Sequence, residues 1–169
     1  MVTELFGENS TKQPKALTDE MLKNAQEVLG YKLPLSYIEL LKTRNGGVPV
    51  RTCFSTSVKT SWVDNYIQIS AIWGIGTDGD KLAERGIDAE CGSQYMIEEW
   101  EYPQIGVMIC PCMSAGPNAV FLDYGECGNY GEPKVVYIDV EDKDEPEIVF
   151  LAKDFETFIN GLVKEEDIE

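Results

Sequence analysis

The sequence contains no histidine, and this limits the chemistry that its other polar residues can perform. The Ser-His-Asp and Cys-His arrangements of hydrolases both use an imidazole base, and imidazole is also the commonest metal ligand in proteins. Cys110 and Cys112 have a spacing that could supply half of a zinc site, but Cys53, Cys91 and Cys127 stand alone. We therefore interpret all five cysteines as reduced thiols and predict no metal and no other cofactor.

Carboxylates are the next candidates for chemistry, because two of them placed across a sugar can hydrolyse a glycosidic bond. Adjacent acids occur at Glu98-Glu99, Glu141-Asp142 and Asp144-Glu145. In a chain with 30 acidic residues, such pairs are expected from composition alone. Asp78 and Asp80 lack the remaining ligands of a calcium-binding loop, so we interpret them as part of a solvated turn.

A glycine pattern, Gly74-x-Gly76-x-x-Gly79, matches the letters of the dinucleotide-binding fingerprint and follows a predicted strand. In that fingerprint the glycines let the backbone and a helix N-terminus approach a pyrophosphate. Here Asp78 would place a negative charge against the pyrophosphate, and no long helix is predicted after the pattern. We interpret the pattern as the turn at the exit of a strand, and we predict that the protein is not an enzyme.

The chain is strongly acidic, since 14 basic and 30 acidic residues give a formal net charge of −16. Residues 1–60 hold eight basic and six acidic side chains, a net +2, whereas residues 61–169 hold six and 24, a net −18. Such a field repels nucleic acids and anionic membranes and attracts cationic partners. We predict a cationic protein partner that binds the second part of the chain, and neither nucleic acid nor membrane as a partner.

Aromatic residues interleaved with acids indicate where a partner could bind, because Trp and Tyr bury large areas in interfaces. They occur around Trp62, from Glu98 to Tyr102 and from Asp123 to Glu132. Trp62, Trp73 and Trp100 can also be explained as core residues, and the sequence leaves this open. The predicted partner-binding residues are Trp62, Asp78, Asp80, Glu98, Glu99, Trp100, Glu101, Tyr102, Asp123, Tyr124, Glu126, Tyr130 and Glu132.

Two amphipathic segments near the N-terminus predict a helical hairpin. Thr18 can cap a first helix that ends at Gly30. A second helix is expected to begin with Pro34 in its first position, where no backbone N–H is needed. Gly46 is expected to close the end of this helix with a positive φ.

Short β-branched segments separated by Gly, Pro and acidic turns then predict an antiparallel meander. The expected strands are 50–55, 66–73, 105–110, 119–123, 135–140 and 148–151, with helices at 93–100 and 154–163. The predicted fold is α+β: an antiparallel sheet of about five to six strands, with the N-terminal helical hairpin and a C-terminal helix packed against it.

The length of 169 residues and the hydrophobic content of 43% suit one domain with a sizeable core. We assign residues 17–163 to this domain, 1–16 to a loose N-terminal arm and 164–169 to a charged tail. The first 13 residues resemble no secretory signal and no run of 18 apolar residues occurs, so we expect a cytoplasmic protein.

Several short motifs follow one another in the order found in one known family. They are Leu33-Pro34, Tyr37, Asn45-Gly46-Gly47, Trp73-Gly74-Ile75-Gly76, Trp100-Glu101-Tyr102-Pro103, Phe121-Leu122-Asp123-Tyr124, Pro133-Lys134-Val135-Val136, Asp154-Phe155 and Gly161-Leu162. In this order, over about residues 17–163, they resemble the SUKH superfamily, which includes the yeast cell-wall assembly regulator and many bacterial toxin-immunity proteins. The segment 110–117 departs from the family, where a short polar, acidic turn is common.

The resemblance implies a non-catalytic immunity protein that binds and neutralises a cognate polymorphic toxin, often a nuclease. An acidic surface over a cationic active site would be the physical means of neutralisation. The alternative is a regulatory adaptor or scaffold similar to the yeast regulator, without a toxin partner. Oligomeric state and the identity of the partner do not follow from the sequence.

Overall fold

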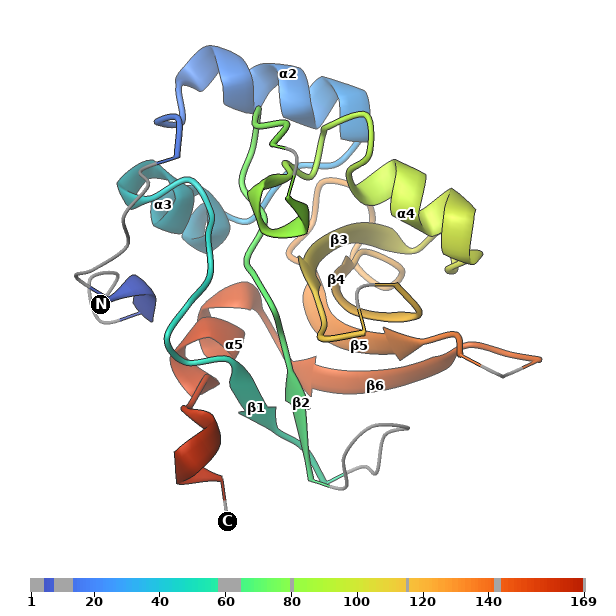
Figure 1. The fold of residues 1–169 in the computed structure, drawn as a ribbon. Helices are drawn as coiled ribbons and strands as arrows, with labels where there is room; N and C mark the ends of the chain where they lie inside the picture. The colour runs from blue at the N-terminus through green and yellow to red at the C-terminus, as the bar shows by residue number, and fades with distance from the viewer. Residues whose placement is uncertain are drawn as a thin grey trace.

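The computed structural model describes residues 5–7, 14–57, 65–79, 81–114, 116–141 and 144–168, and within them the fold is α+β, as predicted. The α-helices of this part are α2 (Asp19–Leu29), α3 (Leu35–Thr43), α4 (Ser93–Trp100) and α5 (Phe155–Gly161), and the 3₁₀ helices are η1 (Leu82–Glu84) and η2 (Glu165–Asp167). In Figure 1, α3 lies on the left of the molecule, and the far end of α4 lies on the right.

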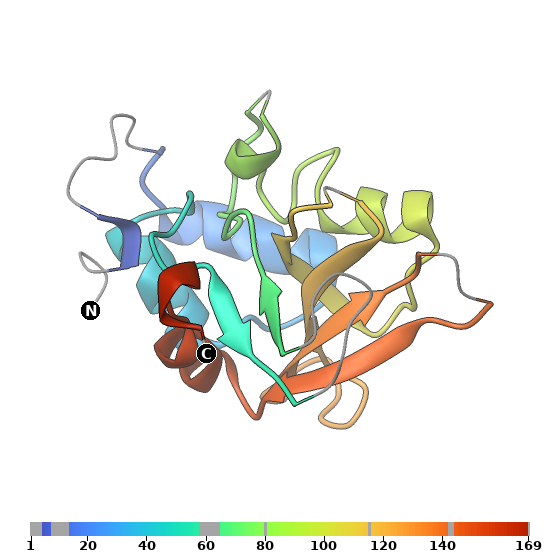
Figure 2. The same ribbon diagram turned by 60° about the horizontal axis from the view of Figure 1, so that its bottom comes forward.

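The strands form a consecutive antiparallel meander. A two-stranded sheet joins β1 (Cys53–Ser55) and β2 (Tyr66–Gln68), and a four-stranded sheet has the order β3 (Gly106–Pro111), β4 (Asn118–Asp123), β5 (Lys134–Asp139) and β6 (Glu147–Ala152). Figure 2 shows β5 and β6 side by side along the lower edge of the molecule.

The chain after β2 connects the two sheets. The Ser70 N–H donates to the Pro111 carbonyl and the Trp73 N–H donates to the Ile109 carbonyl, each over 2.8 Å. The expected strand 66–73 is therefore a short strand followed by an irregular continuation that pairs with β3. In space the six strands follow one another in the order of the sequence.

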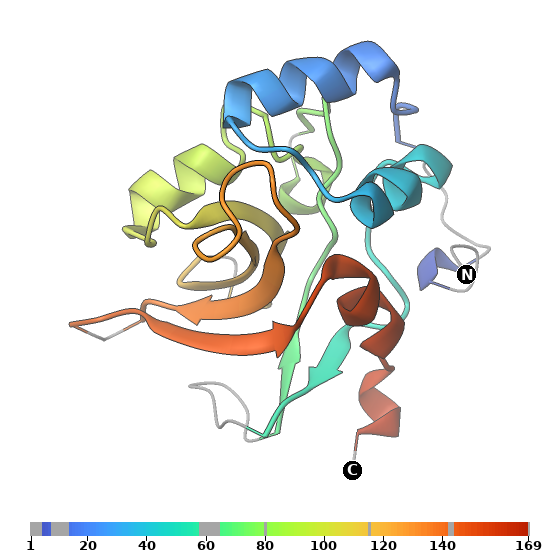
Figure 3. The same cartoon turned by 180° about the vertical axis from the view of Figure 1, so that it is seen from behind.

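Helices cover the sheet closely enough to bury both faces of its central strands. All residues of β3 and β4 are buried. The helix α4 packs on β3, and α5 packs on β1, β5 and β6, which Figure 3 shows from behind. Trp73 lies in this core with no exposed surface, so this tryptophan is a core residue and not part of a binding surface.

Local signals placed most helix ends correctly. The Thr18 hydroxyl accepts the Met21 N–H over 3.2 Å, and Gly30 ends α2 with φ +80°. The Asp154 carboxylate accepts the Thr157 N–H over 2.8 Å at the start of α5, and this hydrogen bonding lowers the pKa of Asp154. Pro34 is the residue before α3 rather than its first helical residue.

The segment after α3 presses against the segment after β2. Asn45 is 3% exposed; its Nδ2 donates to the Ile75 carbonyl over 2.7 Å, and its Oδ1 accepts the Ile75 N–H over 2.8 Å. The Tyr37 hydroxyl donates to the Trp73 carbonyl over 2.6 Å. Gly46 has φ +89°, as predicted, but α3 already ends at Thr43, so Gly46 forms the contact between the two segments rather than the helix end.

Parts of both terminal segments contact the domain. Within the predicted N-terminal arm, Leu5 and Phe6 are 1% and 5% exposed, and the Leu5 carbonyl accepts the Val50 N–H over 2.7 Å. Within the predicted tail, Glu165 accepts a hydrogen bond from Gln68 Nε2 over 3.4 Å. In the ranges described above, no helix has both the length and the apolar character needed to cross a membrane.

Candidate protein-binding surface

The C-terminal end of α4 carries the first group of residues predicted to bind a partner. Glu98 and Glu99 are exposed on the helix, and Trp100, its last residue, keeps 40% of its surface exposed. The indole lies against Gly116, where a Cβ would overlap the ring. Tyr102 turns inward and donates from its hydroxyl to the Gly116 carbonyl; burial raises the pKa of Tyr102, so its hydroxyl stays neutral.

A hollow of about 540 Å³ opens beside this end of α4. It is lined by Glu99, Trp100, Glu101, Ser114, Pro117, Val140 and Glu141, and we call it the acidic hollow. Three carboxylates and a partly exposed indole surround it, and both kinds of group attract a cation: the carboxylates by charge and the indole by its π-electron face. The side chain that fits this lining best is a lysine or an arginine.

The loop before β4 holds one wall of the acidic hollow. The Ser114 hydroxyl donates to Oδ1 of Asn118 over 2.6 Å, and Asn118 is 2% exposed. Within the described ranges, Nδ2 of Asn118 has no hydrogen-bond partner. The Nδ2 atom is itself buried, so Asn118 supports the wall from inside and offers no donor to the hollow.

Glu101 adopts an unusual backbone conformation at the rim of the acidic hollow. It is the C-cap of α4 with φ +56°, the one non-glycine residue with positive φ among the described residues. The left-handed region costs an L-residue with a side chain about 1–2 kcal/mol, and glycine or asparagine usually occupies such a cap. Glu101 thus places a carboxylate at the rim at some expense of stability, which is typical of residues at functional sites.

Replacing Glu101 by glycine should therefore stabilise the protein. We expect the free energy of unfolding to rise by about 1 kcal/mol and the thermal midpoint by about 2–4 °C. Glu99→Gly is the matched control, because it removes the same side chain from a residue with helical φ in the last turn of α4 and should lower stability by up to about 1 kcal/mol. Thermal unfolding of both variants checks this, and equal losses would contradict the role assigned to the cap.

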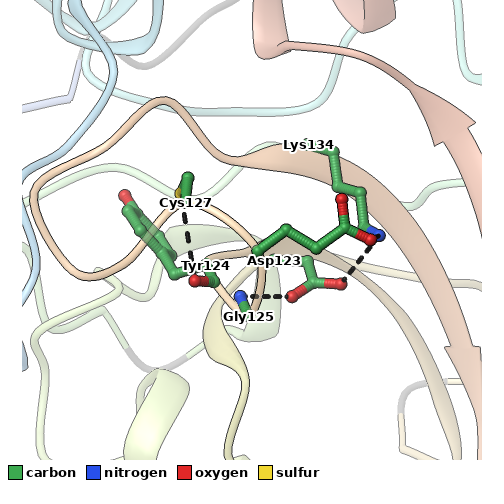
Figure 4. A network of polar contacts seen from close by, with 6 residues as sticks. Asp123, Tyr124, Gly125, Cys127 and Lys134 are labelled. Atoms are coloured by element: carbon green, nitrogen blue, oxygen red, sulfur yellow. Dashed lines mark hydrogen bonds and ion pairs between the residues drawn. The ribbon is translucent and has the colours of Figure 1, made fainter.

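The second predicted group lies in the turn between β4 and β5. Asp123 accepts the Gly125 N–H over 2.8 Å and lies 3.8 Å from Lys134 Nζ, and Figure 4 shows these three residues together. Lys134 Nζ also donates to Glu126 over 2.7 Å. The hydrogen bond from Lys134 lowers the pKa of Glu126. Lys134 pairs with two acids of this turn and offsets one of their two negative charges, so the turn is a weaker attractor of cations than its sequence indicates.

The same turn contributes an exposed aromatic residue to another hollow. Tyr130 is 80% exposed and borders a hollow of about 690 Å³ between α2 and α3, together with Tyr31, Leu33, Leu35 and Ile38. We call it the apolar hollow, although Lys23, Gln26, Glu27 and Lys32 form part of its rim. Tyr124 does not take part: it is 3% exposed, and its hydroxyl donates to the Lys32 carbonyl over 2.8 Å.

The predicted site residues therefore fall into four groups. Glu99, Trp100 and Glu101 line the acidic hollow, with Glu98 exposed next to them on α4, and Glu126, Tyr130 and Glu132 are exposed on the β4–β5 turn. Tyr102, Asp123 and Tyr124 are buried, so we leave them out of the surface proposed below. Asp78 is exposed elsewhere, and Trp62 and Asp80 lie outside the described residues.

The acidic hollow is completed by residues that the sequence did not indicate. Ser114, Pro117 and Val140 come from two other segments of the chain, and only the folded sheet brings them to α4. The proximity of Lys134 to Asp123 could be inferred from the sequence, because a hairpin with strands at 119–123 and 135–140 places the two residues near each other. The two residues are register partners in the structure.

The cysteines are all free thiols in the structure. Cys110 and Cys112 are buried in and next to β3, and burial raises the pKa of both thiols. Cys127 is exposed, with a pKa raised first by partial burial and also by nearby acids. In the described part of the chain, no three or more Cys, Asp or Glu residues form a group that could hold a metal ion.

A thiol reagent should therefore modify Cys127 first in the native protein. We expect its rate to keep rising above pH 9, because the thiolate is the reactive form and its pKa is raised, while Cys110 and Cys112 stay unmodified. Mass spectrometry of partly labelled protein identifies the order, with Cys127→Ser as the control. Labelling after denaturation should reach all five thiols; a lower count, or early modification of Cys110, would contradict this assignment.

The family can now be decided by comparison with known sequences. The sequence model of the SMI1 / KNR4 family (SUKH-1) matches residues 16–161. The chain belongs to the SUKH-1 family. The match covers both N-terminal helices, the sheet and α5, so the resemblance seen in the ordered motifs is confirmed. Comparison with curated proteins and with solved structures gives no significant match.

Several of the motif residues that resemble the family are internal. Tyr37, Asn45, Gly46 and Gly74 make the contact between α3 and the segment after β2, and Trp73 is buried. These residues stabilise the fold and present no side chain for recognition. Among the motif residues, Trp100 and Glu101 instead present side chains at the surface, where they line the acidic hollow.

Proposed function

We propose that this SUKH-1 protein is a non-catalytic immunity protein of the cell interior that binds a cognate protein toxin and neutralises it. We further propose that the acidic hollow receives a lysine or arginine side chain of that toxin. The observation that carries the proposal is the exposed Trp100 between Glu99, Glu101 and Glu141. A partly exposed tryptophan surrounded by charges of one sign is the composition of an interface hot spot for a charged partner.

Two further observations support a binding role. The chain has no histidine, and its net charge of −16 favours rapid association with a cationic surface such as a nuclease active site. The strained backbone of Glu101 starts its side chain from the rim of the hollow, where the carboxylate is exposed to a partner.

A regulatory adaptor is the second candidate, and the apolar hollow is the observation that favours it. Tyr130 and Leu35 are 80% and 68% exposed there, and they face a different part of the molecule from the acidic hollow. An adaptor needs two separate binding surfaces, whereas an inhibitor needs one.

Affinity purification from the native host, followed by an activity assay, tests the proposal. The wild-type protein should capture a basic protein and inhibit its activity at a 1:1 ratio, and Trp100→Ala should capture much less of it. Tyr130→Ala is the matched control, since it removes an exposed aromatic residue at the other hollow. A captured protein that keeps full activity when bound, or one lost only with Tyr130→Ala, would favour the adaptor and contradict neutralisation through the acidic hollow.

A further inference from the structure

A third hollow, of about 550 Å³, carries the opposite charge. Four of the chain's 14 basic residues line it, namely Lys15, Arg44, Lys81 and Arg85, and Glu84 is the one acidic residue among the described lining. We call it the basic hollow. Such a concentration of positive charge is unexpected in a chain with 30 acidic residues, and it accounts for part of the positive charge of residues 1–60.

The contact made by Asn45 fixes two of these residues. Asn45 Nδ2 also donates to the Lys15 carbonyl over 2.9 Å, which holds the backbone of Lys15 at the rim. Arg44 donates from Nε to the Gly46 carbonyl over 3.2 Å, and its guanidinium carbon lies 5.3 Å from the centre of the Phe6 ring. A Cβ on Gly47 would come within 3.1 Å of Nε, so this glycine makes room for the guanidinium. Arg44 is therefore held in one orientation.

The 3₁₀ helix η1 fixes the other two basic residues, Lys81 and Arg85. Lys81 precedes it and Arg85 follows it, so both cations flank one short turn. The indole N–H of the buried Trp73 donates to the Leu82 carbonyl over 2.8 Å, which attaches η1 to the core. Three separate segments thus bring four cations to one hollow, each with a backbone position fixed by hydrogen bonds.

Three of these four cations are not neutralised by any described residue. Among the described residues, Lys15, Lys81 and Arg85 form no ion pair, whereas Lys134 pairs with two acids. Asp78 is exposed and lies outside the lining, and Glu84 contributes one negative charge inside it. The described lining therefore holds four basic side chains and one acidic side chain, in a molecule whose net charge is −16. The three cations without an ion pair, Lys15, Lys81 and Arg85, converge on a concave surface and favour an anion there.

We propose that the basic hollow binds the phosphoryl group of a small molecule. A guanidinium held in a fixed plane together with ammonium groups matches the several oxygen acceptors of a phosphate. The volume of about 550 Å³ lies in the range of small-molecule sites. Pro14, Val48 and Ala83 supply an apolar wall for an organic group attached to the phosphate.

The glycine pattern considered in the sequence takes part in this site in a different way from the dinucleotide fingerprint. Gly74 and Gly79 line the basic hollow, but the Gly76 N–H is bound to the Asp88 carboxylate over 2.8 Å. The pattern is followed by η1 and not by an α-helix, so no helix dipole is available for a pyrophosphate. The side-chain cations, rather than backbone N–H groups, bind the phosphate in this proposal.

Calorimetric titration of the full-length protein at low ionic strength tests the proposal, with pyrophosphate, ADP and adenosine as probes. We expect pyrophosphate and ADP to bind and adenosine not to bind. A higher affinity for ADP indicates that the apolar wall contacts an organic group, and equal affinities indicate that phosphate alone is recognised. Binding of neither anion, or equal binding of adenosine, would overturn the proposal.

Charge-removing variants locate the binding. Lys81→Gln with Arg85→Gln should weaken pyrophosphate binding by at least about tenfold, because two charge-assisted contacts are lost. Lys23→Gln with Lys32→Gln at the apolar hollow changes the net charge equally, from −16 to −18, and should have little effect. Equal weakening by both pairs would show a response to overall charge and contradict a local site. If the variant with Lys81→Gln and Arg85→Gln does not fold, Lys15→Gln replaces it in this test, because it alters a single exposed side chain of the basic hollow.

Discussion

Replacing Gly46 by alanine should lower the free energy of unfolding by about 3 kcal/mol or more, the largest effect on stability that we expect from a single methyl group in this protein. Two costs add at this position. The φ of +89° disfavours any residue with a Cβ by about 1–2 kcal/mol, and the new Cβ would lie 2.7 Å from the Gly74 nitrogen and 2.9 Å from the Ile72 oxygen. Both neighbours are backbone atoms, so no side-chain rotation relieves the overlap.

Gly128 provides a matched control for this prediction. Its φ of +77° is similar, but a Cβ there would have no heavy atom within 4 Å. Gly128→Ala should therefore lower the free energy of unfolding only by the cost of the positive φ, about 1–2 kcal/mol. Thermal unfolding should show a fall of about 6–12 °C for Gly46→Ala and about a third to two thirds of that for Gly128→Ala. Equal midpoints would mean that the close approach of the two segments does not contribute to stability.

The second large effect is expected in the kinetics of partner binding. Changing Glu98, Glu99 and Glu101 together to glutamine should slow association by about tenfold or more at low salt and flatten its dependence on ionic strength, because long-range attraction by these charges raises the association rate. Trp100→Ala should instead speed dissociation by at least about 30-fold, as expected for a buried interface aromatic worth 2 kcal/mol or more. Surface plasmon resonance with the purified partner separates the two rates.

The control for the charge variant is a second triple change, Glu165, Glu166 and Asp167 to their amides. Both triples take the net charge from −16 to −13, but the second lies in η2, away from the acidic hollow. Equal slowing by both triples would assign the attraction to the whole molecule and not to α4. An association rate of the parent protein that does not change with salt would exclude electrostatic attraction as the mechanism.

The fold was predictable wherever a rule acts over a few residues. Thr18 and Asp154 cap their helices, Gly30 ends α2 with positive φ, and the strand pattern locates β3 to β6, because capping and side-chain alternation depend on near neighbours in the chain. The pairing of the segment after β2 with β3 was not predicted, because hydrogen bonds such as that from Trp73 to Ile109 join residues far apart in sequence.

The candidate site was predictable in part for the same reason. The acids and Trp100 at the end of α4 are adjacent in sequence, so their grouping was visible, but the wall formed by Ser114, Pro117 and Val140 was not. The exposure of the aromatic side chains was the least predictable feature. Tyr102 and Tyr124 stand among acids in the sequence, yet both hydroxyls donate to backbone carbonyls inside the protein, and nothing in the local sequence distinguishes them from the exposed Tyr130.

The contact between Asn45 and the Ile75 backbone has a consequence for how relatives of this protein can diverge. The motif residues at this joint, Tyr37, Asn45, Gly46 and Gly74, hold α3 to the segment after β2, so each is constrained by its neighbours inside the molecule. The charged side chains around the hollows take no part in that joint, and residues such as Glu99 or Lys81 could change without disturbing it. One scaffold can then acquire new partners by substitution of these charged side chains, while the joint that holds its helices to its sheet stays the same.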